Sequence, residues 1–498
     1  MKKRVGERIQ AEISEFYANE VLLPTTLVEY DQGFKEMILL NKAHTIMLME
    51  EQIIEKQAAA MILEGLDRVW RELKRDDLDG AYEELYFNVQ KSLFDRIRIE
   101  VGGKLHTGRS RNDIYATLTR MEVRRSLWEV MQRVIDLQQV LITGASEDID
   151  TVITGYTHRM PAQPITIGHF YLGVSNAFHR DFIRLQNAYR CTNISPYGSA
   201  ALAGTGFAIN RQRQCELLGF EKLLTNSLDG VGARDFILEA ESAFVIMMSN
   251  LSRAAQDLYV WSGDEYGVYA PGSAVSLISS IMPQKKNPDS LEMAEGKAGH
   301  ALGSFVSAFS AIKNTPFSFS QDLLEASVMY WEGHSQTLQA LGLLCETIKY
   351  STFNKQRARY LVENNFSTVT ALADFLVRKF KIPFWQAHDI VGDMVRRVHD
   401  SGRLMDGLTS RLLKDVAQEI FQLDLEVDSE EIQACLDPEK NVQSKISEGS
   451  PGRKSVEQML SEANEYLSDE KNWLKKEMKR VESAYQQIDE AQFSLIKA

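Results

Sequence analysis

The distribution of proline constrains the fold more than any other feature of the sequence. The chain has 498 residues but only 11 prolines, and none of them lies between Pro24 and Pro161. A proline inside a helix removes a backbone hydrogen bond and clashes with the preceding turn, so a long stretch without proline permits long helices. The same stretch lacks the turn residues that separate short strands. We therefore predict that helices dominate this part of the chain.

Apolar residues in the centre of the chain recur three or four positions apart, which is the spacing of one face of a helix. The pattern is clearest in residues 113–145, and similar patterns follow in residues 242–262 and 289–314. A helix of about 30 residues is roughly 45 Å long. Several such helices with one apolar face each predict a bundle, and hence an all-α fold.

The length and the changing texture of the sequence predict about three domains. A chain of 498 residues exceeds what one compact core usually holds. From about residue 361 the helical units become shorter, with Gly and Pro between them. We expect an N-terminal helical domain at 1–110, the central long-helix bundle at 111–360 and a C-terminal helical domain at 361–498.

The composition excludes several classes of protein. There are 56 basic and 69 acidic residues, a net charge of −13, and no dense Lys/Arg block, which argues against nucleic acid or an anionic membrane as a partner. No apolar window suits a membrane span, and residues 1–16 lack the apolar run of an export signal. The four cysteines are far apart, and nucleotide-binding and metal-binding motifs are absent. We predict a cytoplasmic protein without a cofactor or a metal ion.

Four polar segments interrupt the helical pattern, at residues 102–113, 155–164, 195–206 and 279–292. The first contains Ser110, Arg111, Asn112 and Asp113, directly ahead of a long predicted helix. Ser and Asp at a helix start are ordinarily caps, and for Ser110 and Asp113 that alternative stays open. The guanidinium of Arg111, with neighbouring hydroxyl, amide and helix N-terminal N–H groups, favours a binding site for a small carboxylate.

The second polar segment carries His158 beside Thr157. A lone histidine in a helical protein is more often structural than catalytic. Most of the nine histidines lie in ordinary amphipathic patterns, whereas His106 and His158 lie in polar segments that lead into helices. These two histidines are therefore the candidates for a functional role.

The segment SSIMPQKKNPDSLE, residues 279–292, combines many functional groups in a stretch that its two prolines keep from being regular helix. The small residues ahead of it indicate a loop that can close, at about residues 270–290. Lys285 and Asn287 can bind a carboxylate, and Ser279 and Ser280 are hydroxyls close to an ammonium group and backbone amides. Such surroundings stabilise an oxyanion, so a serine here can act as a base. The alternative is a solvated lysine loop with capping residues.

Together and in this order, the polar segments resemble the sequence blocks of the argininosuccinate lyase branch of the aspartase/fumarase superfamily. The resemblance continues into the C-terminal part and covers roughly residues 85 to 455. It implies an all-α subunit of three domains whose central helices assemble into a homotetramer, with each active site shared among three subunits. It also implies reversible β-elimination of an amine from an N-substituted aspartate, which leaves fumarate.

The resemblance also implies a role for each candidate residue. Ser279 is expected to be the base, and Lys285 and Asn287 to hold the carboxylate that gains charge. His158, oriented by Glu292, is expected to assist protonation of the amine. The other expected substrate-binding residues are Ser110, Arg111, Asn112, Thr157 and Gln321.

The chain departs from the argininosuccinate lyase pattern mainly where the amine is held. The family's segment after the catalytic loop resembles Y-N-K-D-x-Q-E-D-K, but residues 314–327 read NTPFSFSQDLLEAS, with Gln321 retained and Pro316 and Leu324 in place of the Tyr and Lys. A site that loses such polar contacts loses recognition of an amino-acid head group. We therefore favour a paralogue with a different amine, such as an ethylenediamine-disuccinate-type aminopolycarboxylate; genuine argininosuccinate lyase is the alternative. Further departures are Tyr86, Ile114, Arg159, Met160 and Ile278.

Two other classes of protein are alternatives to an enzyme. One is a catalytically silent relative, since the family includes lens crystallins, and the other is a helical scaffold. The complete set of candidate groups argues against both: Ser279, Lys285, Asn287, Arg111 and His158.

Overall fold

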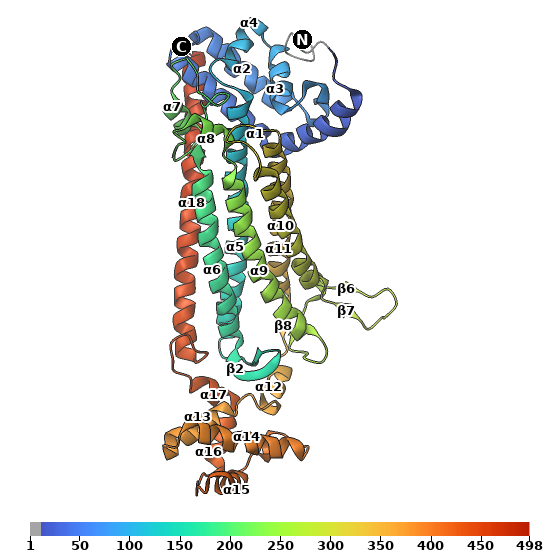
Figure 1. Ribbon diagram of the computed structural model, residues 1–498, viewed down its shortest axis with the longest axis vertical. Coiled ribbons are helices and arrows are strands. Elements are labelled where there is room, and N and C mark those ends of the chain that lie inside the picture. Colours follow the sequence, from blue (N-terminus) through green and yellow to red (C-terminus); the bar gives the residue numbers. More distant parts are fainter. Residues whose placement is uncertain (1–10, 498) are drawn as a thin grey trace.

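The computed structural model describes residues 11–497 and consists mainly of helices, which confirms the predicted all-α class. The first ten residues, which contributed to the prediction that an export signal is missing, lie outside the described residues. Long helices run side by side along the molecule (Figure 1): α5 (Arg111–Glu147), α6 (Ile167–Thr192), α9 (Asp235–Ser262), α10 (Asp289–Ile312), α11 (Asp322–Tyr350) and α18 (Arg453–Lys497). With 37 residues, α5 is roughly 55 Å long.

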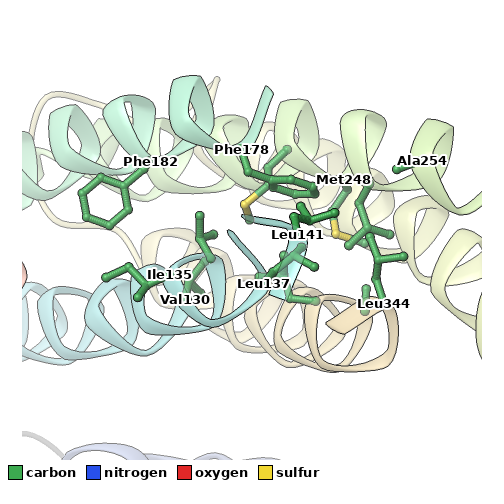
Figure 2. Close-up of a cluster of buried hydrophobic side chains, with 14 of the residues drawn as sticks. Val130, Ile135, Leu137, Leu141, Phe178, Phe182, Met248, Ala254 and Leu344 are labelled. Carbon is green, nitrogen blue, oxygen red and sulfur yellow. The ribbon is translucent and has the colours of Figure 1, made fainter. Parts of the chain in front are cut away.

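The bundle core is formed by the apolar faces of these helices. Figure 2 shows Phe182 of α6 opposite Val130 and Ile135 of α5, and Phe178 of α6 near Leu137 and Leu141; all these side chains are buried. Burying one such side chain contributes about 1.5–3 kcal/mol to folding. The apolar positions from Val123 onward that predicted a helix at 113–145 are therefore those that face this core.

A separate cluster of buried apolar residues lies at one end of the bundle, around the N-terminal helices. The start of α5 contributes Ile114, Tyr115 and Leu118 to this cluster. The elements here are η1 (Tyr17–Leu22), α1 (Leu23–Glu50), α2 (Lys56–Glu72), η2 (Arg75–Asp77), η3 (Gly80–Tyr82), α3 (Leu85–Phe94), α4 (Ile99–Gly102), η4 (Gly103–His106), α7 (Arg211–Leu217) and α8 (Ser227–Gly232). The polar segments 102–113 and 195–206 therefore lie at this end of the bundle.

A third cluster of buried apolar residues lies beyond the opposite end (Figure 1). The elements at this end are α12 (Lys355–Asn364), α13 (Thr370–Phe380), α14 (Phe384–Asp400), η6 (Met405–Gly407), α15 (Ser410–Phe421), α16 (Ser429–Leu436) and α17 (Pro438–Gln443). The final helix, α18, runs back along the bundle and packs on α5 and α6. The sequence predicts a C-terminal domain at 361–498. We propose a shorter C-terminal unit that ends near residue 452, with α18 as part of the bundle.

The strands within residues 11–497 are short and pair in twos. The antiparallel hairpin of β1 (Val152–Thr157) and β2 (Met160–Thr166) connects α5 to α6. Segment 155–164, interpreted from the sequence as a polar stretch leading into a helix, is thus a hairpin. The antiparallel pair β6 (Leu277–Ile278) and β7 (Lys286–Asn287) carries a loop that projects from the side of the bundle (Figure 1).

The remaining strands make local connections. β3 (Ile194–Ser195) pairs in parallel with β4 (Lys222–Leu223), and β5 (Tyr269–Ala270), followed by η5 (Ser273–Val275), pairs with β8 (Thr352–Phe353) in the antiparallel sense. Among the helices of the described residues, none combines the length and the apolar character that a membrane span requires.

Candidate active site

Ser110 immediately precedes α5 and caps it. Its hydroxyl accepts a hydrogen bond from the N–H of Asn112 at 3.4 Å, and the carboxylate of Asp113 accepts one from the N–H of Ser110 at 2.9 Å. The capping role considered for Ser110 and Asp113 is therefore observed. The buried Asp113 also accepts hydrogen bonds from the N–H groups of Gly198 and Ala200, at 3.0 and 2.9 Å, which fixes the third polar segment against the start of α5.

Arg111, the first residue of α5, already has carboxylate partners within the chain. Its Nη1 lies 3.2 Å from Oε2 of Glu83 and 3.2 Å from Oε1 of Glu84, and its guanidinium lies over the ring of Phe87. Burial raises the pKa of Glu84 to about 7, although the charge of Arg111 opposes that rise. The Arg111 side chain is 44% exposed, so the rest of its planar donor fork can still meet a ligand. Neighbouring Asn112 donates its amide to the carbonyl of Ala201 at 3.1 Å.

Sequence reasoning did not find Glu83 and Glu84 as partners of Arg111. They lie more than 25 positions before it, and two adjacent acidic residues ahead of a predicted helix do not indicate a partner elsewhere in the chain. A contact between elements so far apart in sequence has no periodic signal, and only the folded chain reveals it.

His106, the second histidine candidate, lies in this same region. Its Nδ1 is 2.6 Å from the hydroxyl of Tyr86, one of the positions that depart from the family pattern. Burial and the nearby charges of Arg109 and Arg111 lower the pKa of His106 to about 4, so the imidazole is neutral at pH 7. Arg109 itself is buried and donates from Nη1 to the Tyr197 hydroxyl at 2.9 Å. His106 is thus a neutral imidazole that is hydrogen-bonded to Tyr86 and lies near the charged Arg109.

Thr157 and His158 lie at the tip of the β1–β2 hairpin and are exposed. The turn contains His158 and Arg159, with φ angles of 55° and 60°. Residues other than glycine adopt this left-handed region infrequently and at an energetic cost, so the surrounding hairpin must impose it. The geometry presents the imidazole of His158 away from the bundle core, where another molecule can meet it.

Ser279 is held by backbone amides at the root of the projecting loop. Its Oγ accepts hydrogen bonds from the N–H of Met282 at 3.0 Å and, more weakly, from that of Ile281 at 3.4 Å. Ser279 is half-buried and Lys285 is exposed. The Lys286 ammonium donates to the carbonyl of Pro271, which anchors the loop to the chain before it. The sequence predicts a serine hydroxyl among backbone amides in this loop, and the Ser279 hydroxyl has such surroundings.

Glu292 and Gln321 occupy helix starts. Glu292 lies exposed in the first turn of α10, and its hydrogen bond with the Tyr259 hydroxyl raises the pKa of that tyrosine. Within the described residues of one chain, no hydrogen bond joins Glu292 to His158. Gln321 precedes α11 and is exposed.

One chain therefore does not bring the candidate residues together. Ser110, Arg111 and Asn112 lie at the start of α5, whereas Thr157 and His158 lie beyond its end, roughly 55 Å away by the length of the helix. The loop with Ser279 projects from the side of the bundle (Figure 1). A site that uses all three groups requires more than one copy of the chain.

Two protein families match the sequence. Residues 13–303 match a family described as lyase, and residues 366–443 match one described as argininosuccinate lyase C-terminal. Among similar proteins, argininosuccinate lyase 1 of Shouchella clausii is 39% identical over 465 residues, and the argininosuccinate lyase of Methanocaldococcus jannaschii is 36% identical over 466 residues. In both comparisons the match covers 93% of each chain.

Solved structures give a consistent result. The crystal structure of EDDS lyase in complex with formate is 30% identical in sequence and superposes with a TM-score of 0.87, over 99% of this chain and 98% of that one. A class II fumarase from Schistosoma mansoni is only 14% identical, with a TM-score of 0.70 over 86% of this chain and 92% of that one, and shares the fold.

Proposed function

Because the chain belongs to the argininosuccinate lyase family of the aspartase/fumarase superfamily, we propose that it catalyses reversible elimination of an amine from an N-substituted L-aspartate to give fumarate. The observation that carries the proposal is the Ser279 hydroxyl, whose oxygen accepts hydrogen bonds from two backbone N–H groups on a projecting loop. Those two donors favour the alkoxide form, which is the form that can act as a base.

The reaction begins with proton transfer to Ser279. Its Oγ takes a proton from the carbon beside a substrate carboxylate, and the electron pair moves into that carboxylate, which becomes a dianion. The ammonium of Lys285 and the amide of Asn287 stabilise the added charge. The C–N bond then breaks, fumarate forms, and the leaving amine takes a proton with the help of His158. Every ~1.4 kcal/mol of stabilisation in the transition state is worth a factor of ten in rate.

The second carboxylate of the substrate is assigned to the start of α5. Arg111 offers the planar fork that suits a carboxylate, and Ser110, Asn112 and Thr157 add hydroxyl and amide groups. Arg111 is shared with Glu83 and Glu84 in the single chain, so substrate has to compete with these two carboxylates. The partial exposure of Arg111 supports this role.

We propose a homotetramer in which three subunits contribute to each active site. The separation of the three groups along one chain supports this arrangement. So does α10, which exposes Leu302, Val306 and Phe309 on one face, each about half exposed. Apolar residues that share a face of a helix and lie open to solvent are characteristic of a surface that another subunit covers.

For the amine, we propose an aminopolycarboxylate such as ethylenediamine-disuccinate. Leu324 packs against the N-terminal apolar cluster at the position where the argininosuccinate lyase pattern has a lysine. A leucine there provides no ammonium for an amino-acid carboxylate. The structural similarity to EDDS lyase agrees with this choice.

Genuine argininosuccinate lyase is the second candidate. The observation that favours it is the sequence identity to the argininosuccinate lyases of Shouchella clausii and Methanocaldococcus jannaschii, at 39% and 36%. In either case we propose that the enzyme works in the cytoplasm, because all four cysteines are free thiols, as in a reducing compartment.

Incubation of the purified protein with fumarate and one amine at a time tests the proposal. The amines are ethylenediamine and arginine, and mass spectrometry identifies the products. We expect an adduct of ethylenediamine with fumarate. An arginine adduct alone would establish the second candidate. If fumarate forms no adduct with either amine, the proposed choice of amine is contradicted.

A further inference from the structure

A polar cavity lies where the β1–β2 hairpin meets the C-terminal helices. Its volume is about 590 Å³, within the usual range of about 300–1,000 Å³ for small-molecule sites. Its walls come from β2, the start of α6, Ser367 and α13, α17 and the segment 444–451 between α17 and α18. Figure 1 shows β2 above α17 and α13 at this junction. None of the residues to which we assign catalysis or substrate binding lines this cavity.

Two residues of the cavity wall have buried polar atoms without a partner. The Ser367 hydroxyl oxygen and the Asn441 amide oxygen have no hydrogen bond in the described residues, and these side chains are only 2% and 3% exposed. The Asn441 amide nitrogen, in contrast, donates to the Thr368 carbonyl at 3.0 Å, which fixes the direction of the side chain. An unsatisfied buried polar atom costs about 1–3 kcal/mol, so a group that bonds to either oxygen gains affinity.

Charges of both signs also line the cavity. Lys445 and Arg378 are cationic and Asp374 is anionic. Lys445 and Asp374 interact electrostatically, yet the described residues contain no direct ion pair between them. Burial lowers the pKa of Lys445 to about 8, so most of it is still an ammonium ion at pH 7. His169, also in the wall, bonds through Nε2 to the carbonyl of Gly449 at 3.0 Å.

We propose that this cavity binds a small zwitterionic amino acid. Its carboxylate would meet the ammonium of Lys445, with Arg378 available to a second acidic group, and its ammonium would meet the Asp374 carboxylate and the Asn441 amide oxygen. The Ser367 hydroxyl supplies one more donor. A simple carboxylic acid would use only the cations of the wall, and a simple amine only Asp374, so a ligand with both charges makes the most contacts.

Binding at this cavity would act on the hairpin that carries His158. The Lys445 ammonium donates to the carbonyl of Pro164 at 3.0 Å, and Pro164 lies in β2. The hydrogen bond between Lys445 and Pro164 joins the C-terminal unit to the hairpin. A ligand carboxylate bound to the same ammonium would therefore contact this connection directly. The proposal does not rest on the lyase reaction and is tested by binding alone.

Isothermal titration calorimetry of the full-length protein tests the proposal. The probes are the proteinogenic L-amino acids, each at up to about 10 mM, which covers weak dissociation constants. Propionate and n-propylamine each carry one of the two charges. We expect at least one amino acid to bind and propionate and n-propylamine not to bind. If no amino acid binds, or if propionate or n-propylamine binds as tightly as the amino acids, the ligand class is wrong.

Variants then locate the bound amino acid. Lys445→Met and Asp374→Asn each weaken binding at least about tenfold, since each removes one charged partner. Lys440→Met, in the neighbouring helix α17 but outside the cavity wall, leaves the affinity unchanged. If Lys445→Met and Asp374→Asn bind as tightly as the natural chain, the amino acid binds elsewhere and the assignment of the cavity fails.

Ser367→Ala separates a ligand-binding role from a structural one. Because its hydroxyl has no partner among residues 11–497, its removal should leave the melting temperature of the unliganded protein unchanged or higher. The same variant should bind the amino acid more weakly. A lower melting temperature together with unchanged affinity would overturn the assignment of Ser367 as a ligand contact.

Discussion

Nη1 of Arg111 lies 3.2 Å from Oε1 of Glu84, a buried carboxylate whose pKa burial raises to about 7. The guanidinium that we assign to a substrate carboxylate is thus already oriented by an internal one. Arg111→Leu should lower kcat/KM at least about 100-fold, because a charge-assisted pair of hydrogen bonds contributes about 2.7 kcal/mol to binding of the dicarboxylate. Steady-state kinetics would measure this effect.

The control for Arg111 is Arg98→Leu, which removes an exposed arginine in the same region. Its kcat/KM should remain within about twofold of the natural enzyme, as for most surface substitutions. Equal losses in the two variants would mean that Arg111 has no specific role.

Two adjacent lysines in the projecting loop should behave differently. Lys285→Met should lower kcat about 1,000-fold, because its ammonium stabilises charge that develops only in the transition state. Lys286→Met should lower kcat less than about tenfold, because the Lys286 ammonium is bonded to the carbonyl of Pro271 and supports only the loop. The reverse order of effects in single-turnover measurements would contradict the assignment of Lys285.

Separation of the candidate residues along the chain predicts complementation between inactive variants. Ser279→Ala and His158→Asn should each be nearly inactive, but a mixture that is dissociated and reassembled should regain activity. If each site takes these two residues from different subunits, random assembly restores about one site in four. Each variant reassembled alone serves as the control. No recovery in verified mixed tetramers would show that one subunit supplies both residues.

The half-buried Glu29 predicts how stability depends on pH. It accepts hydrogen bonds from the Leu85 N–H at 2.9 Å and the Tyr115 hydroxyl at 3.0 Å, yet burial raises its pKa from 4.5 to about 8. Between these values the folded chain keeps a proton that the unfolded chain releases. The free energy of unfolding therefore falls as pH rises from 4.5 to 8.

Glu29→Gln removes this titration and should be more stable than the natural chain at pH 8 by about 2 kcal/mol, with a smaller gain or none at pH 5. Denaturant unfolding at the two pH values measures the difference. Glu100→Gln, at an exposed position, is the matched control and should change neither value. A loss of stability that is equal at pH 5 and pH 8 would contradict the prediction.

The long helices were predictable because proline and apolar spacing act locally. No proline interrupts residues 25–160. The residues spaced three and four apart in 113–145 face the bundle core from Val123 onward, and the earlier ones face the N-terminal cluster. The path of α18 was not predictable in this way, because its apolar face does not indicate which of the other helices it packs against. The polar segments likewise indicated which chemical groups are present, but not how far apart these groups lie in the folded chain.

The details that sequence reasoning missed depend on tertiary contacts. The turn of the β1–β2 hairpin places His158 and Arg159 at positive φ, against local preference. Pro161 and Pro164 lie in a strand, where proline is disfavoured except at an edge. Sequence spacing likewise gave no reason to pair Arg111 with Glu83 and Glu84.

The most direct test of the account compares Ser279→Ala with Ser280→Ala. Ser279 accepts hydrogen bonds from two backbone N–H groups, whereas the neighbouring Ser280 is exposed and has no such bond among the described residues. With assembly verified by light scattering, fumarate release by Ser279→Ala should fall at least about 1,000-fold, and Ser280→Ala should keep most of its activity. Full turnover by Ser279→Ala would contradict the assignment of this serine as the base.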